Sequence, residues 1–332
     1  MICAQDLVAV DLYSIYDEYA RTTESTKQER CKMPKVSVII PTHNRAEYLR
    51  NAIESASKQT FQDLEIIVVD DNSTDHTAEV VEGFENRKIK YIRKNVKKGP
   101  SAARNTAILE SKGKYIAFLD DDDEWVPNKL QEQIKLLDRS KLKICGVYSN
   151  RLVLERATKR LISANPQADK LKGNLLSQLL IGSPIHTSTV LLKKRCLDEI
   201  GLFDETMSYM EDRDLWIRLS LKYDFEYIND PLSIAYVHKQ GHLSESLEGQ
   251  TAGREKLLQK YSNLFSQNKK SWSKLHLLQG AQYCQLKNMK KGRKNILKGI
   301  KINPFNFEAY LHLLSSIFGQ SAYQFLRKSF RI

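Results

Sequence analysis

Four consecutive carboxylates, Asp120 to Asp123, stand at the end of an apolar run in this chain. The run, residues 115–119, is short and continuous, which is typical of a buried strand. Four adjacent acids cannot share a buried strand, because like charges resist joint ionisation. They are therefore expected just beyond its C-terminal end, where open α/β sheets bind ligands. Clustered carboxylate oxygens suit a divalent Mg or Mn ion and a phosphate-bearing substrate; a solvated acidic turn is the alternative.

A second strand ends in the same way upstream. Residues 65–69 lead into Asp70 and Asp71, and a third apolar run, residues 36–40, leads into the polar stretch 41–45. Helical spacing or helix-start signals predict helices at 46–59, 74–84 and 99–109. A short strand is predicted at 89–92, between the second and the third of these helices. This alternation predicts an α/β fold with a mostly parallel sheet and helices on both faces.

Five stretches of the chain together resemble the motifs of family 2 glycosyltransferases, which have the Rossmann-like GT-A fold. They are residues 36–45, 68–73, 99–105, 119–123 and 210–216. No single stretch would suffice, but their order and spacing match, and the resemblance covers residues 35–242. It implies an inverting transfer of a sugar from a nucleotide sugar to an acceptor hydroxyl.

The resemblance also implies roles for individual residues. Asp122 matches the metal-ligating acid of the family, and His238 resembles its late histidine near the diphosphate and the metal. His242 competes for that second role, and an exposed loop histidine is the alternative. The expected nucleotide-binding residues are Asp71 on the uracil ring, Pro41, Thr42 and Asn44 in the base-pocket loop, Arg104 on the base or a phosphate, and Asp120 and Asp121 on the ribose or on metal-bound water. For Arg104 the alternative is a structural salt bridge.

Inversion needs a base on the acceptor side of the anomeric carbon, and Asp212 matches the family's base position. Apolar residues follow it at helical spacing, which predicts a helix that begins near Asp212. Glu211 and Asp212 could instead only complement the helix dipole, which is the reading we favour for Glu211. His186 falls where acceptor contacts would be expected, in a part of the chain, residues 150–190, that matches no pattern.

The charge of this chain is unevenly distributed. Its net charge is +12, yet residues 256–332 alone carry 15 lysines and arginines against one acid, Glu308, so this tail carries +14 and the remainder −2. Residues 269–332 combine basic with apolar side chains, which suits an anionic membrane surface. A solvated basic face is the alternative. The resemblance points to lipid-linked or surface-polysaccharide acceptors at the cytoplasmic face, and hence to a peripheral enzyme.

Two rival classes explain only part of these features. A nucleic-acid-binding protein would account for the basic tail but not for carboxylates at two strand ends, so no nucleic-acid partner is expected. A nucleotidyltransferase shares the sheet and the need for a metal, but it typically has a Gly-rich, Arg-containing loop after the first strand. Here that place holds residues 41–45, Pro-Thr-His-Asn-Arg.

Three regions are expected along the chain: an N-terminal helical extension at 1–33, a GT-A catalytic domain at 34–247, and a basic helical region at 248–332. Residues 279–304 faintly resemble one tetratricopeptide-like unit, which cannot be stable alone and should pack on the catalytic domain or a partner. Five cysteines without a CxxC pair indicate reduced thiols in a cytosolic setting. The N-terminus lacks the basic start of a secretory signal, and no run of 18 apolar residues occurs.

Overall fold

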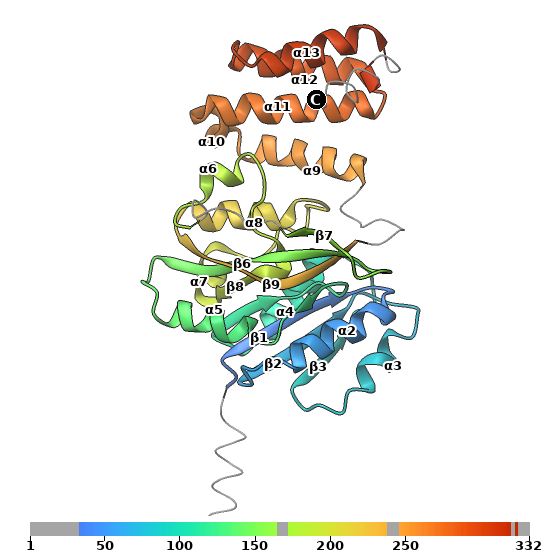
Figure 1. The fold of residues 1–332 in the computed structure, drawn as a ribbon, viewed down its shortest axis with the longest axis vertical. Coiled ribbons are helices and arrows are strands. Elements are labelled where there is room, and N and C mark those ends of the chain that lie inside the picture. Colours follow the sequence, from blue (N-terminus) through green and yellow to red (C-terminus); the bar gives the residue numbers. More distant parts are fainter. Residues whose placement is uncertain (1–32, 165–171, 238–245, 320–322, 325–332) are drawn as a thin grey trace, which may run out of the picture. The chain divides into compact units, whose positions relative to one another are not determined.

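Four parallel strands form the first half of a nine-stranded sheet in the computed structural model (Figure 1). They are β1 (Val36–Thr42), β2 (Leu64–Asp70), β3 (Ile89–Arg93) and β4 (Tyr115–Phe118), in the spatial order β3-β2-β1-β4. These strands coincide with the predicted runs. Parallel pairing brings the C-terminal ends of β1, β2 and β4 to one edge, so the acidic stretches predicted from the sequence lie at that edge.

The second half of the sheet is mixed, and most of it was not predicted. β8 (Val190–Lys193) lies antiparallel to β4, and β6 (Ile144–Glu155) lies antiparallel to β8. The long strand β9 (Asp224–Val237) runs parallel to β6 with several register shifts. The two short strands β5 (Glu124–Trp125) and β7 (Leu161–Ala164) pair antiparallel with β9 and β6. The α/β class is therefore confirmed, but the parallel order stops at β4.

Alternate residues of the central strands pack into two separate cores, one on each face of the sheet. Val38, Ile40 and Ile66 pack with α2 (Ala46–Ser57) and α5 (Lys129–Asp138). Ile39, Ile67 and Phe118 pack on the opposite face with α4 (Pro100–Glu110) and α8 (Glu211–Ser220). The period of two follows from the pleat of a strand and buries both faces. The other α-helices described in this part of the chain are α3 (Thr77–Glu82), α6 (Leu176–Leu179) and α7 (Lys194–Ile200), and a short 3-10 helix, η2 (Thr187–Thr189), precedes β8.

The structure describes residues 33–164, 172–237, 246–319 and 323–324. The expected N-terminal extension, apart from Met33, and both His238 and His242 lie outside these ranges. Lys35–Ile332 forms one compact unit, so the proposed division at residue 248 stays a prediction. Within the described ranges, no helix has the length and apolar character that crossing a bilayer requires.

The predicted C-terminal helices are present. They are α9 (Leu247–Lys260), α10 (Ser262–Gln267), α11 (Lys269–Gln285), α12 (Met289–Ile302) and α13 (Phe307–Ile317). α11 and α12 pack closely, since a Cβ on Gly280 would lie 2.8 Å from the carbonyl oxygen of Gly292. Leu257, Tyr261 and Phe265 belong to the same core as α4 and α8, so these helices bury their apolar face against the sheet-bearing part of the chain.

The contact between α9 and α8 combines close packing with a buried charge. Gly249 and Gly253 of α9 face Tyr209, and any side chain at either position would overlap that residue. One turn into α8, Asp214 is fully buried and accepts hydrogen bonds from Tyr261 Oη (2.6 Å) and Arg218 Nε (2.9 Å). Lys260 Nζ lies 2.7 Å from the same carboxylate. The first turn of α8 is thus fixed by the helical region that follows it.

Replacing Asp214 with alanine should destabilise the fold, because Tyr261 would lose its acceptor, Arg218 its carboxylate partner, and Lys260 one of its two carboxylate partners. Removing one partner of a buried ion pair costs about 3–5 kcal/mol, and the partial exposure of Lys260 puts our expectation at the lower end. Urea unfolding at pH 7 measures it. The control is Glu110→Ala, which removes an exposed ion pair with Lys90 and should cost much less, because solvent screens exposed ion pairs. Equal losses in both variants would contradict the assigned role of Asp214.

Candidate active site

The carboxylates after β4 are held by side chains from the end of β1 and from the loop after it. Thr42 Oγ1 donates to Asp121 Oδ2 (2.8 Å), and Arg45 Nη1 donates to Asp121 Oδ1 (3.2 Å) and Asp122 Oδ2 (2.6 Å). Asp121 and Asp122 are both buried. The structure therefore brings together the predicted residues Thr42, Asp121 and Asp122. Thr42 was expected to contact the nucleotide base, and here its side chain contacts a carboxylate. Pro41 lies inside β1 opposite Val69.

The arginine does not fully compensate these acids. Burial, together with the neighbouring Asp122 carboxylate, raises the pKa of Asp121 to about 7. Burial also raises the pKa of Asp123 well above its ordinary value, and Asp120 and Asp122 add to that rise. The Asp121 and Asp122 carboxylates raise the pKa of Arg45 in turn, against its own burial. The site therefore has a surplus of negative charge that a further cation would relieve.

A divalent ion fits these residues if a substrate shares it. Among the described residues, no three His, Cys, Asp or Glu side chains form a group that could hold a metal ion by themselves. Mg²⁺ is usually bound through one or two carboxylates together with substrate phosphates, and seldom by an all-protein cage. Asp122, at the end of β4 among partly compensated acids, suits that arrangement. The second expected ligand, His238, lies outside the described residues.

Asp71 has a structural role that the sequence did not reveal. Its carboxylate accepts hydrogen bonds from the backbone N–H groups of Lys98 (3.0 Å) and Gly99 (2.6 Å) and lies 3.5 Å from Lys94 Nζ. Gly99 precedes α4 with φ of +89°, a conformation that glycine adopts without strain. Asp71 therefore fixes the loop that enters α4. Its expected contact with a uracil ring stays a prediction.

Asn44 joins two loops at the same edge of the sheet. Its backbone N–H donates to Ser73 Oγ (2.9 Å), and its Oδ1 accepts from the Thr74 N–H (2.7 Å). Its φ of +53° is one that asparagine tolerates better than most residues. The loops after β1 and β2 are thus held to each other, which fixes the positions of the predicted base-pocket residues.

Arg104 bridges the strand-end acids to the helix that carries Asp212. Its guanidinium donates to Asp120 Oδ1 (2.7 Å) and Glu211 Oε1 (3.0 Å) and lies 5.4 Å from the Phe203 ring. This buried residue makes the salt bridge that the sequence left as the alternative for Arg104. Glu211, which we expected only to complement the helix dipole, is the second partner of that bridge.

Asp212 lies in the first turn of α8, and its environment raises its basicity. Its Oδ1 accepts the Arg213 N–H at 2.7 Å. Burial, followed by the charge of Glu211, raises the pKa of Asp212 to about 7, and Asp120 contributes to the rise. The charge of Asp120 affects the pKa of Asp212 because Arg104 holds the end of β4 close to the first turn of α8. A half-buried carboxylate with this pKa can take up a proton near neutral pH.

Two arginines at this edge were missed from the sequence. Arg45 stands in a recognised motif, but nothing in its neighbours indicates that it pairs with Asp121 and Asp122. Arg156, far along the chain, donates to the carbonyl oxygen of Asp122 (3.2 Å). Its guanidinium lies 4.4 Å from the Tyr48 ring and 4.6 Å from the Tyr236 ring.

Comparisons with known proteins agree with this architecture. Residues 37–195 match the profile described as glycosyl transferase family 2. An uncharacterised glycosyltransferase of Rickettsia prowazekii is 37% identical over 201 residues, which are 59% of this chain and 63% of that protein. The chain thus spans less than two thirds of that relative. The UDP-Glc:alpha-D-GlcNAc-diphosphoundecaprenol beta-1,3-glucosyltransferase WfaP of Escherichia coli is 30% identical over 192 residues, 57% of this chain and 72% of that protein.

Among solved structures, S. aureus TarS 1–349 in complex with UDP-GlcNAc has the same fold. The TM-score is 0.61 at 20% sequence identity, over 90% of this chain and 91% of that chain. The similarity in sequence, the order of the strands and the acids at their C-terminal ends lead to one conclusion: the chain belongs to the family 2 glycosyltransferases and has the GT-A fold.

Proposed function

We propose that this protein transfers a sugar, with inversion, from a UDP-sugar to a hydroxyl group of a lipid-linked saccharide. The observation that carries the proposal is the bridge made by Arg104. It connects Asp120, beside the acids suited to a diphosphate and its cation, with Glu211, next to the expected base Asp212. A donor-side and an acceptor-side group are thus held on one rigid support, as a displacement reaction requires.

The names of relatives support the choice of substrates. WfaP of E. coli is named for UDP-glucose as donor and for a GlcNAc-diphosphoundecaprenol acceptor, and a Campylobacter jejuni relative is named for a diphosphoundecaprenol-linked oligosaccharide. Lipid-linked acceptors of this class are therefore proposed for this chain.

On the donor side, Asp122 would hold the divalent ion, with His238 as the second expected ligand. When bound, such an ion neutralises charge that develops on the departing nucleoside diphosphate. The loops after β1 and β2, joined through Asn44, would hold the nucleotide. Thr42 and Arg45 orient the Asp121 and Asp122 carboxylates, so that their oxygens have fixed positions before the donor arrives.

On the acceptor side, Asp212 would act as general base. The acceptor hydroxyl oxygen forms a bond to the anomeric carbon while the bond from that carbon to the diphosphate oxygen breaks. The hydroxyl proton passes to Asp212, whose pKa of about 7 makes the carboxylate a better base than an exposed aspartate. The electron pair of the broken bond leaves with the nucleoside diphosphate.

Asp122→Ala should abolish transfer and weaken UDP binding in the presence of Mn²⁺, because an oxygen ligand is lost. The fold should survive, since one crowded carboxylate fewer reduces repulsion. A nucleotide-sugar transfer assay measures the loss of transfer, and calorimetric titration of UDP with and without Mn²⁺ measures the weaker binding. Glu54→Ala, at an exposed site on α2, is the control. Full activity in Asp122→Ala, or wild-type activity that resists EDTA, would remove the metal from the proposal.

Asp212→Asn should lower the rate at saturating substrates by about a hundredfold to ten-thousandfold, the usual contribution of a general base. UDP affinity should barely change. In the wild type the rate should fall as pH falls through about 7, because the base must be deprotonated and its pKa is raised to about 7. The rate is measured at saturating donor, so that titration of Asp121 at the donor site does not contribute to this pH dependence. The variant should lose this acidic limb. A collapse of UDP affinity with normal turnover would instead make Asp212 a binding residue.

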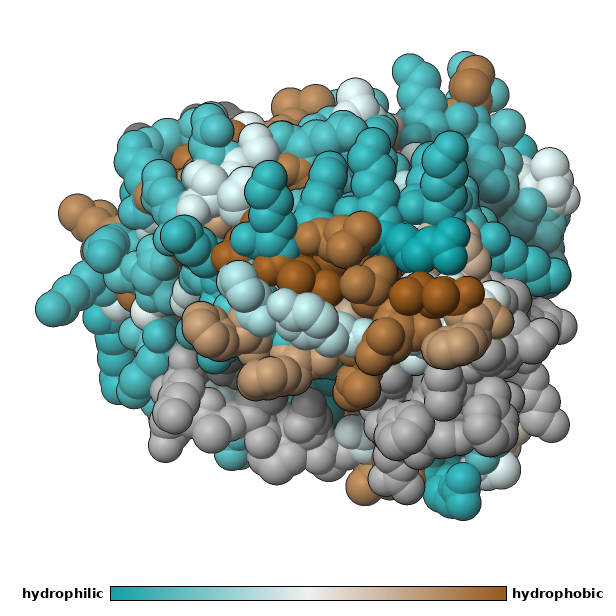
Figure 2. All heavy atoms as spheres, turned by 90° about the horizontal axis from the view of Figure 1, so that it is seen from above, coloured by the Kyte–Doolittle hydropathy of each residue, from teal (hydrophilic) through white to brown (hydrophobic). Residues whose placement is uncertain are grey.

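An anionic membrane surface is proposed as the place where this reaction occurs. Figure 2 shows apolar side chains gathered on the face that is turned to the viewer, with hydrophilic side chains beside them. The large exposed apolar residues described in this region are Leu297 of α12 and seven residues on and around α13: Phe305, Phe307, Tyr310, Leu311, Leu314, Ile317 and Phe318. Basic and apolar side chains together favour peripheral binding to anionic lipid.

Four exposed lysines of α12 allow a test of this surface. Lys290, Lys294, Lys298 and Lys301 are spaced by three or four residues and so share one helix face with Leu297. Changing all four to glutamine should weaken binding to phosphatidylserine vesicles about tenfold or more at low salt, since each cation contributes about 1 kcal/mol at most. Salt should affect the variant less than the wild type.

Vesicle flotation measures the binding. The matched control removes four lysines from the strand-and-helix region, Lys58, Lys90, Lys112 and Lys143, and should bind almost as the wild type does. If the wild-type protein fails to float with anionic vesicles at low salt, the membrane surface is not a partner of this chain.

A further inference from the structure

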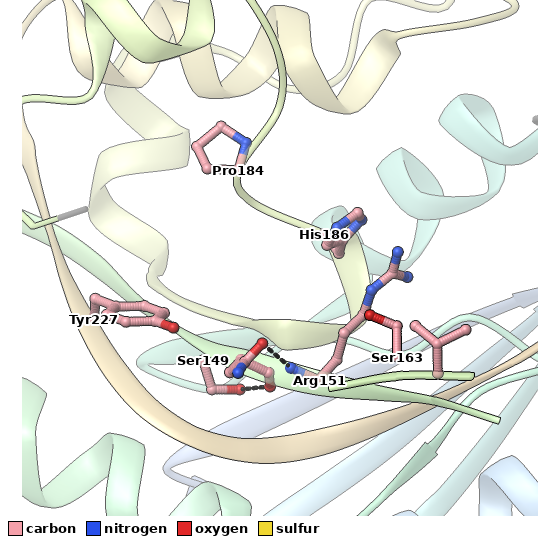
Figure 3. Close-up of a pocket in the computed structure, with 8 residues that line it drawn as sticks. Ser149, Arg151, Ser163, Pro184, His186 and Tyr227 are labelled. Atoms are coloured by element: carbon pink, nitrogen blue, oxygen red, sulfur yellow. Dashed lines mark hydrogen bonds between the residues drawn. The ribbon is translucent and has the colours of Figure 1, made fainter. Parts of the chain in front are cut away.

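A small polar cavity lies beside the candidate active site, between strands of the second half of the sheet (Figure 3). Its volume is about 110 Å³. Three elements line it: β6 through Ser149, Asn150, Arg151 and Val153, β7 through Ser163, and β9 through Tyr227, with Pro184 and His186 from the loop before β8. This volume is well below the roughly 300–1,000 Å³ of pockets for drug-sized ligands. The cavity can therefore take one functional group of a ligand, not a whole nucleotide sugar.

Arg151 gives the cavity its charge. Among the described residues, its guanidinium has no ion-pair partner within 4.0 Å and takes part in no hydrogen bond; the one side chain that bonds to Arg151 is that of Asn150, whose Oδ1 accepts from the backbone N–H. Burial lowers the pKa of Arg151, and the charges of Asp123 and Asp120 offset this only in part. A half-buried guanidinium without a close anion can gain much from a planar, bidentate oxyanion.

His186 adds hydrogen-bonding capacity to this cavity without adding charge. The Arg151 side chain extends from β6 toward His186 in Figure 3. Burial, with a smaller effect of Arg151, lowers the pKa of His186 to about 3, so the imidazole is neutral at physiological pH. A neutral imidazole can donate one hydrogen bond, and Ser163 offers a hydroxyl nearby. The cavity thus presents a single positive charge with neutral polar groups around it, which suits one anionic group.

The position of the cavity separates it from the expected nucleotide site. The candidate nucleotide residues follow β1, β2 and β4, whereas the cavity is lined by β6, β7, β9 and the loop before β8. Arg151 is nonetheless close enough to Asp120 and Asp123 for their charges to act on it. An anion bound there would lie near the reacting groups without being the diphosphate of the donor.

We propose that Arg151 and this cavity bind the phosphate of the acceptor, the group that joins its sugar to the lipid. The proposal rests on the function proposed above, because only a lipid-linked acceptor brings a second diphosphate to this enzyme. In an acceptor with one sugar, the phosphate lies a single sugar ring from the attacking hydroxyl, which agrees with a cavity beside the acids. Recognition of the phosphate would make the enzyme prefer lipid-linked sugars to free ones.

Binding of n-octyl diphosphate to the full chain, saturated with UDP and Mn²⁺, tests this site directly. UDP occupies the donor site, so calorimetry reports the second diphosphate only. The wild type should bind the probe saturably, and Arg151→Gln should weaken binding about ten- to a hundredfold, as expected for hydrogen bonds to a charged group. Arg151→Lys should retain part of the affinity, since lysine keeps the positive charge but lacks the paired N–H donors of a guanidinium. Arg160→Gln, an exposed arginine of the same hairpin, is the matched control.

The outcomes separate this proposal from the general function. UDP affinity and thermal stability should be unchanged in Arg151→Gln; an equal loss of UDP affinity would place Arg151 in the donor site and overturn the proposal. Absence of probe binding by the wild type, or equal binding by Arg151→Gln, would overturn it as well. Asp212→Asn should bind the probe normally although it transfers sugar far more slowly. If that variant remained active, the assigned base would be wrong while the phosphate site stood.

Discussion

Carboxylate crowding at one edge of the sheet is the constraint on which the rest of this structure depends. Parallel strands bring Asp120 to Asp123 to the same edge as the loops after β1 and β2, where burial weakens the ability of water to screen them. Arg45 pairs with two of the acids and Arg104 with a third. These two arginines come from the N-terminal end of α2 and from α4, so neutralising the acids also fixes the helices around the edge.

Arg104 has a consequence beyond charge balance. Because its second partner is Glu211, the first turn of α8 is fixed relative to the end of β4. Tyr261 and Lys260 hold the same turn from the other side through Asp214. The turn that carries Asp212 is therefore held from two directions, and the helical region from α9 onward is part of that support. A site that must hold a hydroxyl within hydrogen-bond reach of a base needs such rigidity.

The sequence predicted the parts of this fold that depend on local pattern. β1 to β4 are continuous apolar runs separated by helical spacing, and the edge that collects their acidic ends follows from parallel pairing alone. β5 to β8 were not predicted, because a two-residue strand and a strand with register shifts carry no period that a sequence reveals. The acids of the site were predicted for the same reason as the strands, because they directly follow continuous apolar runs. Arg45, Arg151 and Arg156 were not assigned, since the partner of a long cationic side chain is set by tertiary packing.

Two acids on α8, two residues apart, show how the environment divides their roles. The N-terminus of a helix favours a carboxylate by about 0.3–1 kcal/mol. An effect of this size makes the carboxyl group less than about tenfold more acidic. Burial and Glu211 outweigh this for Asp212 and raise its pKa from an ordinary 3.8 to about 7. Asp214 has three partners on its carboxylate and so serves as a charged anchor. Asp212 has one backbone donor for its Oδ1, and the charge left uncompensated there is what allows this aspartate to take up a proton near neutral pH.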